Sequence, residues 1–188
     1  MDIAGEYRLA APRQRVWDAL HEADTLQACL PGCESLEKVS DEQVNAVLTA
    51  AVGPVKSRFK TTITLSELEP PASYTMHGEG KGGAAGFGRG SATVALAEDG
   101  PETVLTYEAT LKVGGKLAQV GSRLVVGVAR KISDQFFAAF AERIGADSQS
   151  SQMPTEEDAA TRKRSSAWRV TVGALAFIIV LWVLFGAN

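Results

Sequence analysis

Seven glycines lie between residues 78 and 90, and their spacing includes a motif known from cofactor chemistry. Residues 78–83 read GEGKGG and fit G-x-G-x-x-G, with which some proteins hold the pyrophosphate of a dinucleotide. That use requires a strand before the motif and a helix after it, because the helix N-terminus supplies the anion site. The residues that follow here read as another strand. We therefore interpret the cluster as a bent hairpin and expect no dinucleotide site.

The two cysteines, Cys29 and Cys33, flank a Leu-Pro-Gly turn. Thiolates can bind zinc, but a structural zinc site takes four ligands, and His21 is the only further candidate nearby. The spacing also differs from the C-x-x-C of redox proteins. We therefore expect the cysteines to be structural, as free cysteines usually are.

The second histidine, His77, is expected on a strand surface, although it could donate a proton to a carbonyl group of a ligand. No serine, histidine and carboxylate set indicates a nucleophile, and no paired carboxylates indicate acid–base catalysis. The sequence thus predicts no catalytic residue and no metal ligand, which is typical of a protein that is not an enzyme.

Turn residues divide residues 1–146 into short elements, and this range is the predicted globular domain. Strands of alternating apolar and polar residues indicate an antiparallel sheet that is covered on one face only. Two short helices are expected, one beginning near Pro12 and one over 24–29. The predicted strands cover residues 2–9, 33–40, 43–52, 56–68, 73–81, 86–98 and 103–113.

Residues 116–144 have the spacing of one long helix, with apolar residues recurring every three or four positions. A helix of about 28 residues would run roughly 42 Å, which is long enough to cross a sheet. The sequence therefore predicts an α+β fold in which a long helix closes a curved, seven-stranded antiparallel sheet.

Many strand positions that could face this helix carry small residues. They are Ala46, Ala50, Gly78, Gly80, Gly88, Ala92 and Ala109. Because natural cores are densely filled, small residues indicate either a close approach of helix and sheet or a hollow between them. Close approach explains some of these glycines, whereas a cavity for an apolar ligand explains the whole pattern.

Strand parity and helical spacing select apolar candidates for the lining of this cavity, although a shift of one residue would invert a strand. The predicted ligand-binding residues are Phe59, Ile63, Met76, Phe87, Tyr107, Leu117, Val120, Leu124 and Val128.

The last part of the chain differs from the rest. Residues 170–188 contain no charge, and basic residues at 162–164 and at Arg169 precede them. We predict a single transmembrane tail anchor over 167–188, reached through a disordered linker over 147–166. Because positive residues stay on the cytoplasmic side, the domain is expected to face the cytoplasm from the cell's inner membrane.

Composition narrows the choice of partners. Apolar residues make up 45% of the chain and charged residues 22%, as in ordinary folded proteins. Nineteen basic and 22 acidic residues give a net charge of −3. Proteins that bind nucleic acid usually carry a clustered basic excess, so no nucleic-acid partner is expected.

Three stretches of the chain resemble the family of the carbon monoxide dehydrogenase G subunit. They are Leu30-Pro31-Gly32-Cys33, the glycine-rich run over 78–92, and residues 114–124 followed by Phe136-Phe137. The resemblance covers roughly residues 1–144. It implies the helix-grip fold of the START/Bet v 1-like (SRPBCC) superfamily, whose members hold apolar ligands between the helix and the sheet.

The resemblance also implies a function. Such a protein would be a non-catalytic, membrane-anchored accessory that recruits an aerobic molybdenum carbon monoxide dehydrogenase to the membrane and passes its electrons to the respiratory quinone pool. The expected partners are the other polypeptides of that dehydrogenase or of a related molybdenum hydroxylase, membrane lipid, and a quinone, either menaquinone or ubiquinone. No covalently bound cofactor is expected.

Two other functions stay open at this point. The chain could be a structural anchor or assembly factor that binds no ligand, with the cavity incidental. It could also be an enzyme of the polyketide-cyclase kind on the same fold. A cyclase would need ionisable groups that converge in the cavity, and the inward positions offer few.

Overall fold

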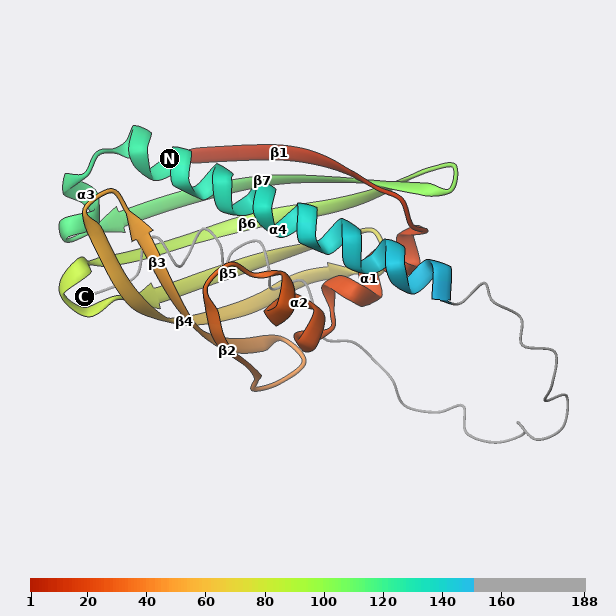
Figure 1. Cartoon of the computed structure of the whole chain (residues 1–188), viewed down its shortest axis with the longest axis horizontal. Coiled ribbons are helices and arrows are strands. Elements are labelled where there is room, and N and C mark those ends of the chain that lie inside the picture. Colours follow the sequence, from red (N-terminus) through yellow and green to blue (C-terminus); the bar gives the residue numbers. More distant parts are fainter. Residues whose placement is uncertain (151–188) are drawn as a thin grey trace, which may run out of the picture.

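Seven segments in which inward-facing and outward-facing side chains alternate form one antiparallel sheet (Figure 1). The structure is a computed structural model that describes residues 1–150. The strands are β1 (Asp2–Leu9), β2 (Cys33–Lys38), β3 (Gln43–Val52), β4 (Val55–Glu69), β5 (Ser73–Lys81), β6 (Phe87–Asp99) and β7 (Glu102–Gly114). Their order in the sheet is β1-β7-β6-β5-β4-β3-β2. The predicted strand ends are confirmed to within two residues.

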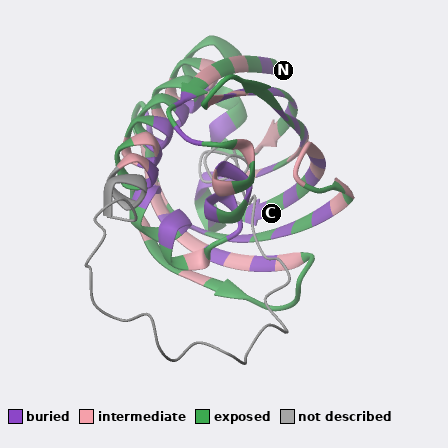
Figure 2. Ribbon diagram, turned by 90° about the vertical axis from the view of Figure 1, so that its right-hand side faces the viewer, coloured by how far each residue is buried: buried purple, intermediate pink, exposed green. Residues whose placement is uncertain are grey.

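The sheet curls around its inner face, and the long helix α4 (Ser122–Ser150) lies along the open side (Figure 2). Buried and exposed residues alternate along the strands, which matches the predicted period of two. Helix α4 comes closest to the sheet at β1 and β3. The helix therefore bridges the curl from its β1 edge towards β3.

Two short helices, α1 (Arg13–Leu20) and α2 (Ala23–Cys29), close one end of the inner face. Trp17 of α1 is fully buried, with its ring stacked on His21 at 4.2 Å and edge-on to Tyr74 of β5 at 5.6 Å. Large apolar side chains thus fill the inner face at the end near α1.

The predicted helix over 116–144 is interrupted. A short helix α3 (Lys116–Gln119) ends before Gly121, whose φ of +90° is a conformation that favours glycine, and α4 then begins at Ser122. The expectation of one continuous helix is therefore wrong at its start. Helix α4 also continues to Ser150, four residues into the predicted linker.

The remainder of that linker and the predicted anchor over 167–188 lie outside the described residues. Within residues 1–150, no helix combines the length and the apolar character needed to cross a membrane. The tail anchor accordingly stays a prediction.

Candidate ligand-binding site

The structure divides the nine predicted lining residues into two groups. Five are buried on the inner side of the sheet, each no more than 3% exposed: Phe59, Ile63, Met76, Tyr107 and Leu117. The other four, Phe87, Val120, Leu124 and Val128, are half-buried or exposed. The first group is thus buried as part of the core, and ligand contact by any of the nine stays a prediction.

Leu124 departs most from its expected place, because 41% of the residue is exposed. The break at Gly121 sets the phase of α4, so Val125 and Ala129 are the residues that turn fully inward. Val120, Leu124 and Val128 instead line an open, mainly apolar hollow of about 410 Å³ at the start of α4. Leu124 also lies beside Gly53, in the β3–β4 turn.

Small residues gather on the inner face at the end of the sheet away from α1. The backbone pairing brings Ala46, Thr61, Gly80 and Gly88 into one row across β3, β4, β5 and β6. In the next row Gly78 pairs with Gly90. We call the residues Ala46, Thr61, Gly78, Gly80 and Gly88 the inner patch, and leave out Gly90 because a side chain there would collide with the backbone of Thr110. Glycine leaves the backbone itself as the surface, so a flat apolar group can approach it closely.

Thr61 differs from the rest of the inner patch because it carries a polar side chain. The residue is 3% exposed, and its Oγ1 has no hydrogen-bond partner. Its neighbours on the same face of β4 are Phe59 and Ile63, which offer no polar atom. Thr61 is not among the residues predicted to line the cavity because its side chain is polar, although its position between Phe59 and Ile63 predicts the inward direction.

An aromatic cluster joins β1, β7 and α4 on the other side of the inner face. The ring of Tyr7 stacks on Phe137 at 4.0 Å, and its hydroxyl donates to Asp134 Oδ1 at 2.7 Å. Burial, followed by the bond to Asp134, raises the pKa of Tyr7 far above its usual value. Burial also raises the pKa of Tyr107. Both phenols therefore stay protonated, and they can serve as hydrogen-bond donors but not as bases.

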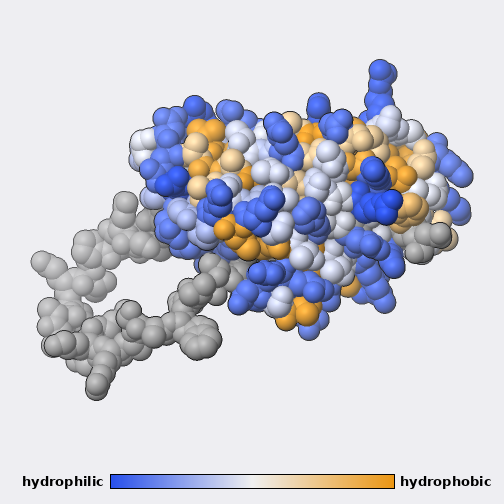
Figure 3. Space-filling view, turned by 180° about the vertical axis from the view of Figure 1, so that it is seen from behind, coloured by the Kyte–Doolittle hydropathy of each residue, from blue (hydrophilic) through white to orange (hydrophobic). Residues whose placement is uncertain are grey.

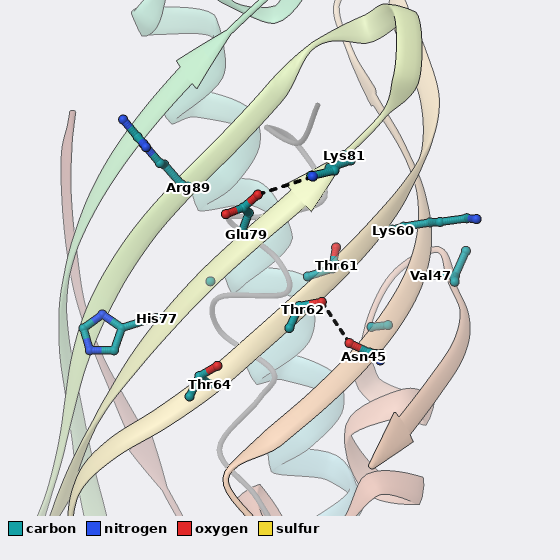
Figure 4. Close-up of a pocket in the computed structure, with 12 residues that line it drawn as sticks. Asn45, Val47, Lys60, Thr61, Thr62, Thr64, His77, Glu79, Lys81 and Arg89 are labelled. Atoms are coloured by element: carbon teal, nitrogen blue, oxygen red, sulfur yellow. Dashed lines mark hydrogen bonds and ion pairs between the residues drawn. The ribbon is translucent and has the colours of Figure 1, made fainter. Parts of the chain in front are cut away.

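A second hollow, of about 830 Å³, opens on the outer face of the sheet (Figure 4). Polar side chains of β3 to β6 project around it, and we call it the outer hollow. Thr62 donates to Asn45 Oδ1 at 2.9 Å, and Lys81 Nζ lies 3.7 Å from Glu79 Oε1. The outward-facing side chains among its lining residues are Asn45, Val47, Lys60, Thr62, Thr64, His77, Glu79, Lys81 and Arg89.

Basic residues are concentrated around the outer hollow. Arg89 lies between Glu79 and Lys112 in the backbone pairing, and Lys60 pairs with Lys81. Within residues 1–150, the structure gives Lys60, Arg89 and Lys112 no carboxylate partner. Figure 3 shows the molecule from this side, with hydrophilic side chains projecting between smaller apolar areas. The basic side chains on this face would attract an acidic protein surface more strongly than an apolar ligand.

The two cysteines and His21 are not among the lining residues of either hollow, whereas His77 lines the outer hollow. Burial raises the pKa of Cys29 and raises that of Cys33 to about 11, so both remain thiols at neutral pH. His21 is buried, whereas His77 is exposed on β5 with Nε2 3.0 Å from Ser66 Oγ. In the part of the chain that is described, no three histidine, cysteine or acidic side chains gather as metal ligands would.

The glycine cluster forms a hairpin, as predicted. Strand β5 passes through the three-residue 3-10 helix η1 (Gly83–Ala85) directly into β6, with no α-helix between the two strands. Gly86, with φ of +122°, lies so close to the backbone of Gly114 and Gly115 that a side chain would collide with it. Glycine at position 86 therefore allows the β5–β6 turn and the end of β7 to approach each other closely.

Comparisons with known proteins identify the fold and a family. The family model of the carbon monoxide dehydrogenase G subunit (CoxG) matches residues 5–145. None of the curated proteins matches the chain. The crystal structure of a conserved protein from Geobacillus kaustophilus is similar at 29% identity and a TM-score of 0.74, over 78% of this chain and 97% of that one.

More distant structures share the fold alone. A protein from Thermus thermophilus is 19% identical with a TM-score of 0.56, over 79% of this chain and 99% of that one. An aromatase/cyclase from a Streptomyces species is 15% identical with a TM-score of 0.57, over 81% of this chain and 98% of that one. The expected helix-grip, Bet v 1-like arrangement of sheet and helix is confirmed for the described residues.

Proposed function

We propose, because this chain belongs to the CoxG family, that it is a non-catalytic accessory that carries a quinone to carbon monoxide dehydrogenase. The name of the family associates its members with that dehydrogenase. The quinone, the recruitment of the enzyme and the membrane anchor are our proposals. Each rests on a different part of the chain.

The observation that carries the proposal is the inner patch. Ala46 of β3, Thr61 of β4 and glycines of β5 and β6 provide a buried, mainly apolar surface of small residues, inside a sheet that α4 spans. A quinone is a flat ring on an apolar tail, and both parts fit such a surface. When bound, the quinone would supply the electron-accepting chemistry, while the chain's own residues hold and orient it.

The outer hollow supports recruitment of a soluble enzyme. Lys60, Arg89 and Lys112 project from the outer face, where charges steer the encounter of two proteins. The docking surface is thus on the opposite side of the same strands from the inner patch. The hollow at the start of α4, lined by Val120, Leu124 and Val128, supports an apolar entrance at that end of the domain.

The apolar tail over 170–188 supports attachment to the inner membrane, with the domain on the cytoplasmic side. Quinones dissolve in the bilayer, so a carrier held at its surface meets a high local concentration of its ligand.

A cyclase-like enzyme is the second candidate, because an aromatase/cyclase shares the fold. The buried polar groups on the inner side argue for the first candidate instead. Thr61, Ser133 and Tyr107 offer hydroxyls, and burial opposes the ionisation of Tyr107 and of the buried His21 that an acid–base catalyst needs.

Reconstitution tests the proposed function. Vesicles containing a quinone are mixed with carbon monoxide dehydrogenase, with and without the full chain, and carbon monoxide-dependent quinone reduction is followed optically. We expect the rate to rise at least tenfold with the chain. A chain that ends at residue 166 serves as control and should leave the enzyme off the vesicles. Equal rates with and without the full chain would contradict the proposal.

A further inference from the structure

The side chain of Thr61 has an unusual place in the inner patch. It lies on the inner side of β4 with Ala46 beside it on β3 and Gly80 beside it on β5. Neither neighbour has a polar side-chain atom, and the backbone groups of these strands are engaged in the sheet. The Thr61 hydroxyl is therefore buried in apolar surroundings without a partner.

Three other buried hydroxyls of the described residues have partners. Thr103 Oγ1 donates to Ala11 O at 2.7 Å, and Ser133 Oγ donates to Ala129 O at 3.0 Å. Thr25 Oγ1 donates to Glu22 Oε2 at 2.9 Å. A buried polar group that lacks a partner costs stability, so its presence calls for a reason such as a ligand.

The position of Thr61 indicates which part of a ligand it would meet. The hydroxyl stands in the same row as Gly80 and Gly88, next to the row of Gly78, where the backbone itself is the surface. A flat ring that displaces the side chains covering these buried glycines would lie on them with its edge towards Thr61. A ring that carries a carbonyl oxygen at its edge would satisfy the hydroxyl.

We propose that Thr61 Oγ1 donates a hydrogen bond to a ring carbonyl oxygen of a quinone that lies on the inner patch. This inference rests on the proposed function and names one polar contact that the chain makes with the bound quinone. Thr61 is thus a specificity residue, because it distinguishes an oxygen-bearing ring from a hydrocarbon of similar size.

Titration of the full chain in detergent tests this assignment. The chain is stripped of lipid and titrated with a short-chain menaquinone and, separately, with a short-chain ubiquinone, with tryptophan fluorescence as readout. Thr61→Val removes the hydroxyl and keeps the shape, whereas Thr61→Ser keeps the hydroxyl. We expect Thr61→Val to raise the Kd for the quinone by about tenfold, the effect of one net hydrogen bond. Thr61→Ser should stay within about threefold of the wild type, since it keeps that hydrogen bond.

Two controls separate binding from folding. Thr61→Val should unfold at the same temperature as the wild type or higher, because the hydroxyl that it loses has no partner. Thr103→Val loses a formed hydrogen bond, so it should lower the unfolding temperature and leave the Kd unchanged. Squalene, an isoprenoid without oxygen, should bind the wild type and Thr61→Val equally.

The outcomes distinguish this inference from the proposed function. If the wild type binds quinone and Thr61→Val binds it equally well, the role of Thr61 is wrong and the proposed function stands. If the wild type binds neither quinone, both are overturned.

Discussion

The inner and outer faces of β4 and β5 are made of alternate residues of the same strands, but they satisfy their polar groups differently. On the outer face Thr62 bonds to Asn45, and Lys81 pairs with Glu79. On the inner face Thr61 lies among apolar neighbours with no partner. Because neighbouring residues of a strand point to opposite faces, a ligand surface and a docking surface can be varied independently within one segment.

The largest expected effect is a difference in the free energy of unfolding between variants at two adjacent residues, one on each face of β4. Phe59→Ala removes a buried ring and should lower the free energy of unfolding by about 3–5 kcal/mol. Lys60→Ala, on the outer face, should change it by less than about 0.5 kcal/mol. Denaturant unfolding of the two variants measures both values. Similar losses at the two positions would contradict the assigned directions of the side chains.

A pH effect on stability is expected from His21, which is buried at the end of α1. Burial lowers the pKa of His21 from 6.5 to about 4, and Nε2 has no partner that could accept a proton from it. The unfolded chain therefore takes up the proton first as the pH falls. The stability gained by keeping His21 neutral is complete above pH 6.5 and is lost as the pH falls to about 4.

The loss amounts to about 3 kcal/mol over that range. His21→Asn has no titrating group and keeps a nitrogen that can donate to Trp17 O, the bond made by His21 Nδ1. Its free energy of unfolding should fall less steeply between pH 6.5 and pH 4 than that of the wild type. Parallel pH profiles for the two proteins would show that His21 is not the responsible group.

A smaller effect is expected for docking on the outer face. Replacement of Lys60, Arg89 and Lys112 by glutamate should raise the Kd for the dehydrogenase by about tenfold or more and leave the Kd for quinone unchanged. Glu108→Lys, a charge change elsewhere on the outer face, is the matched control and should not weaken docking. Surface plasmon resonance at two salt concentrations measures these values, and unchanged docking by the triple variant would exclude the outer hollow.

The smallest effect is expected where α4 begins. Leu124→Gln should change the free energy of unfolding by less than about 0.5 kcal/mol, because the side chain is already exposed. Val125→Ala, at the next residue, should cost at least about 1 kcal/mol because Val125 is fully buried. Thermal unfolding compares the two variants, and a larger loss for Leu124→Gln would place the break in the helix elsewhere.

Much of the fold could be predicted from local patterns. Strand ends follow turn residues such as Gly53-Pro54 and Asp99-Gly100-Pro101, so the predicted and observed bounds of β4 and β7 differ by one residue at each end. The inward direction of Phe59 and Ile63 followed from the period of two. These properties depend on neighbouring residues in the sequence, so a single sequence contains them.

The remaining features depend on contacts between distant residues. Spacing alone placed Leu124 on the buried stripe, but the left-handed backbone of Gly121 changes the phase of α4 and turns Val125 inward. Alternation predicts that Lys60 and Arg89 are outside, but only the strand register brings them to one hollow. That Thr61 has no partner likewise depends on residues from three strands.

The central claim is that this chain carries a quinone, and organic extraction of the purified full chain tests it most directly. The chain is expressed in a host that makes quinone, purified in detergent and extracted, and the extract is analysed by mass spectrometry. An unrelated single-span membrane protein, purified in the same way, gives the background. We expect quinone in near-equimolar amount with the chain and well above that background. Quinone at the background level, with the chain folded, would contradict it.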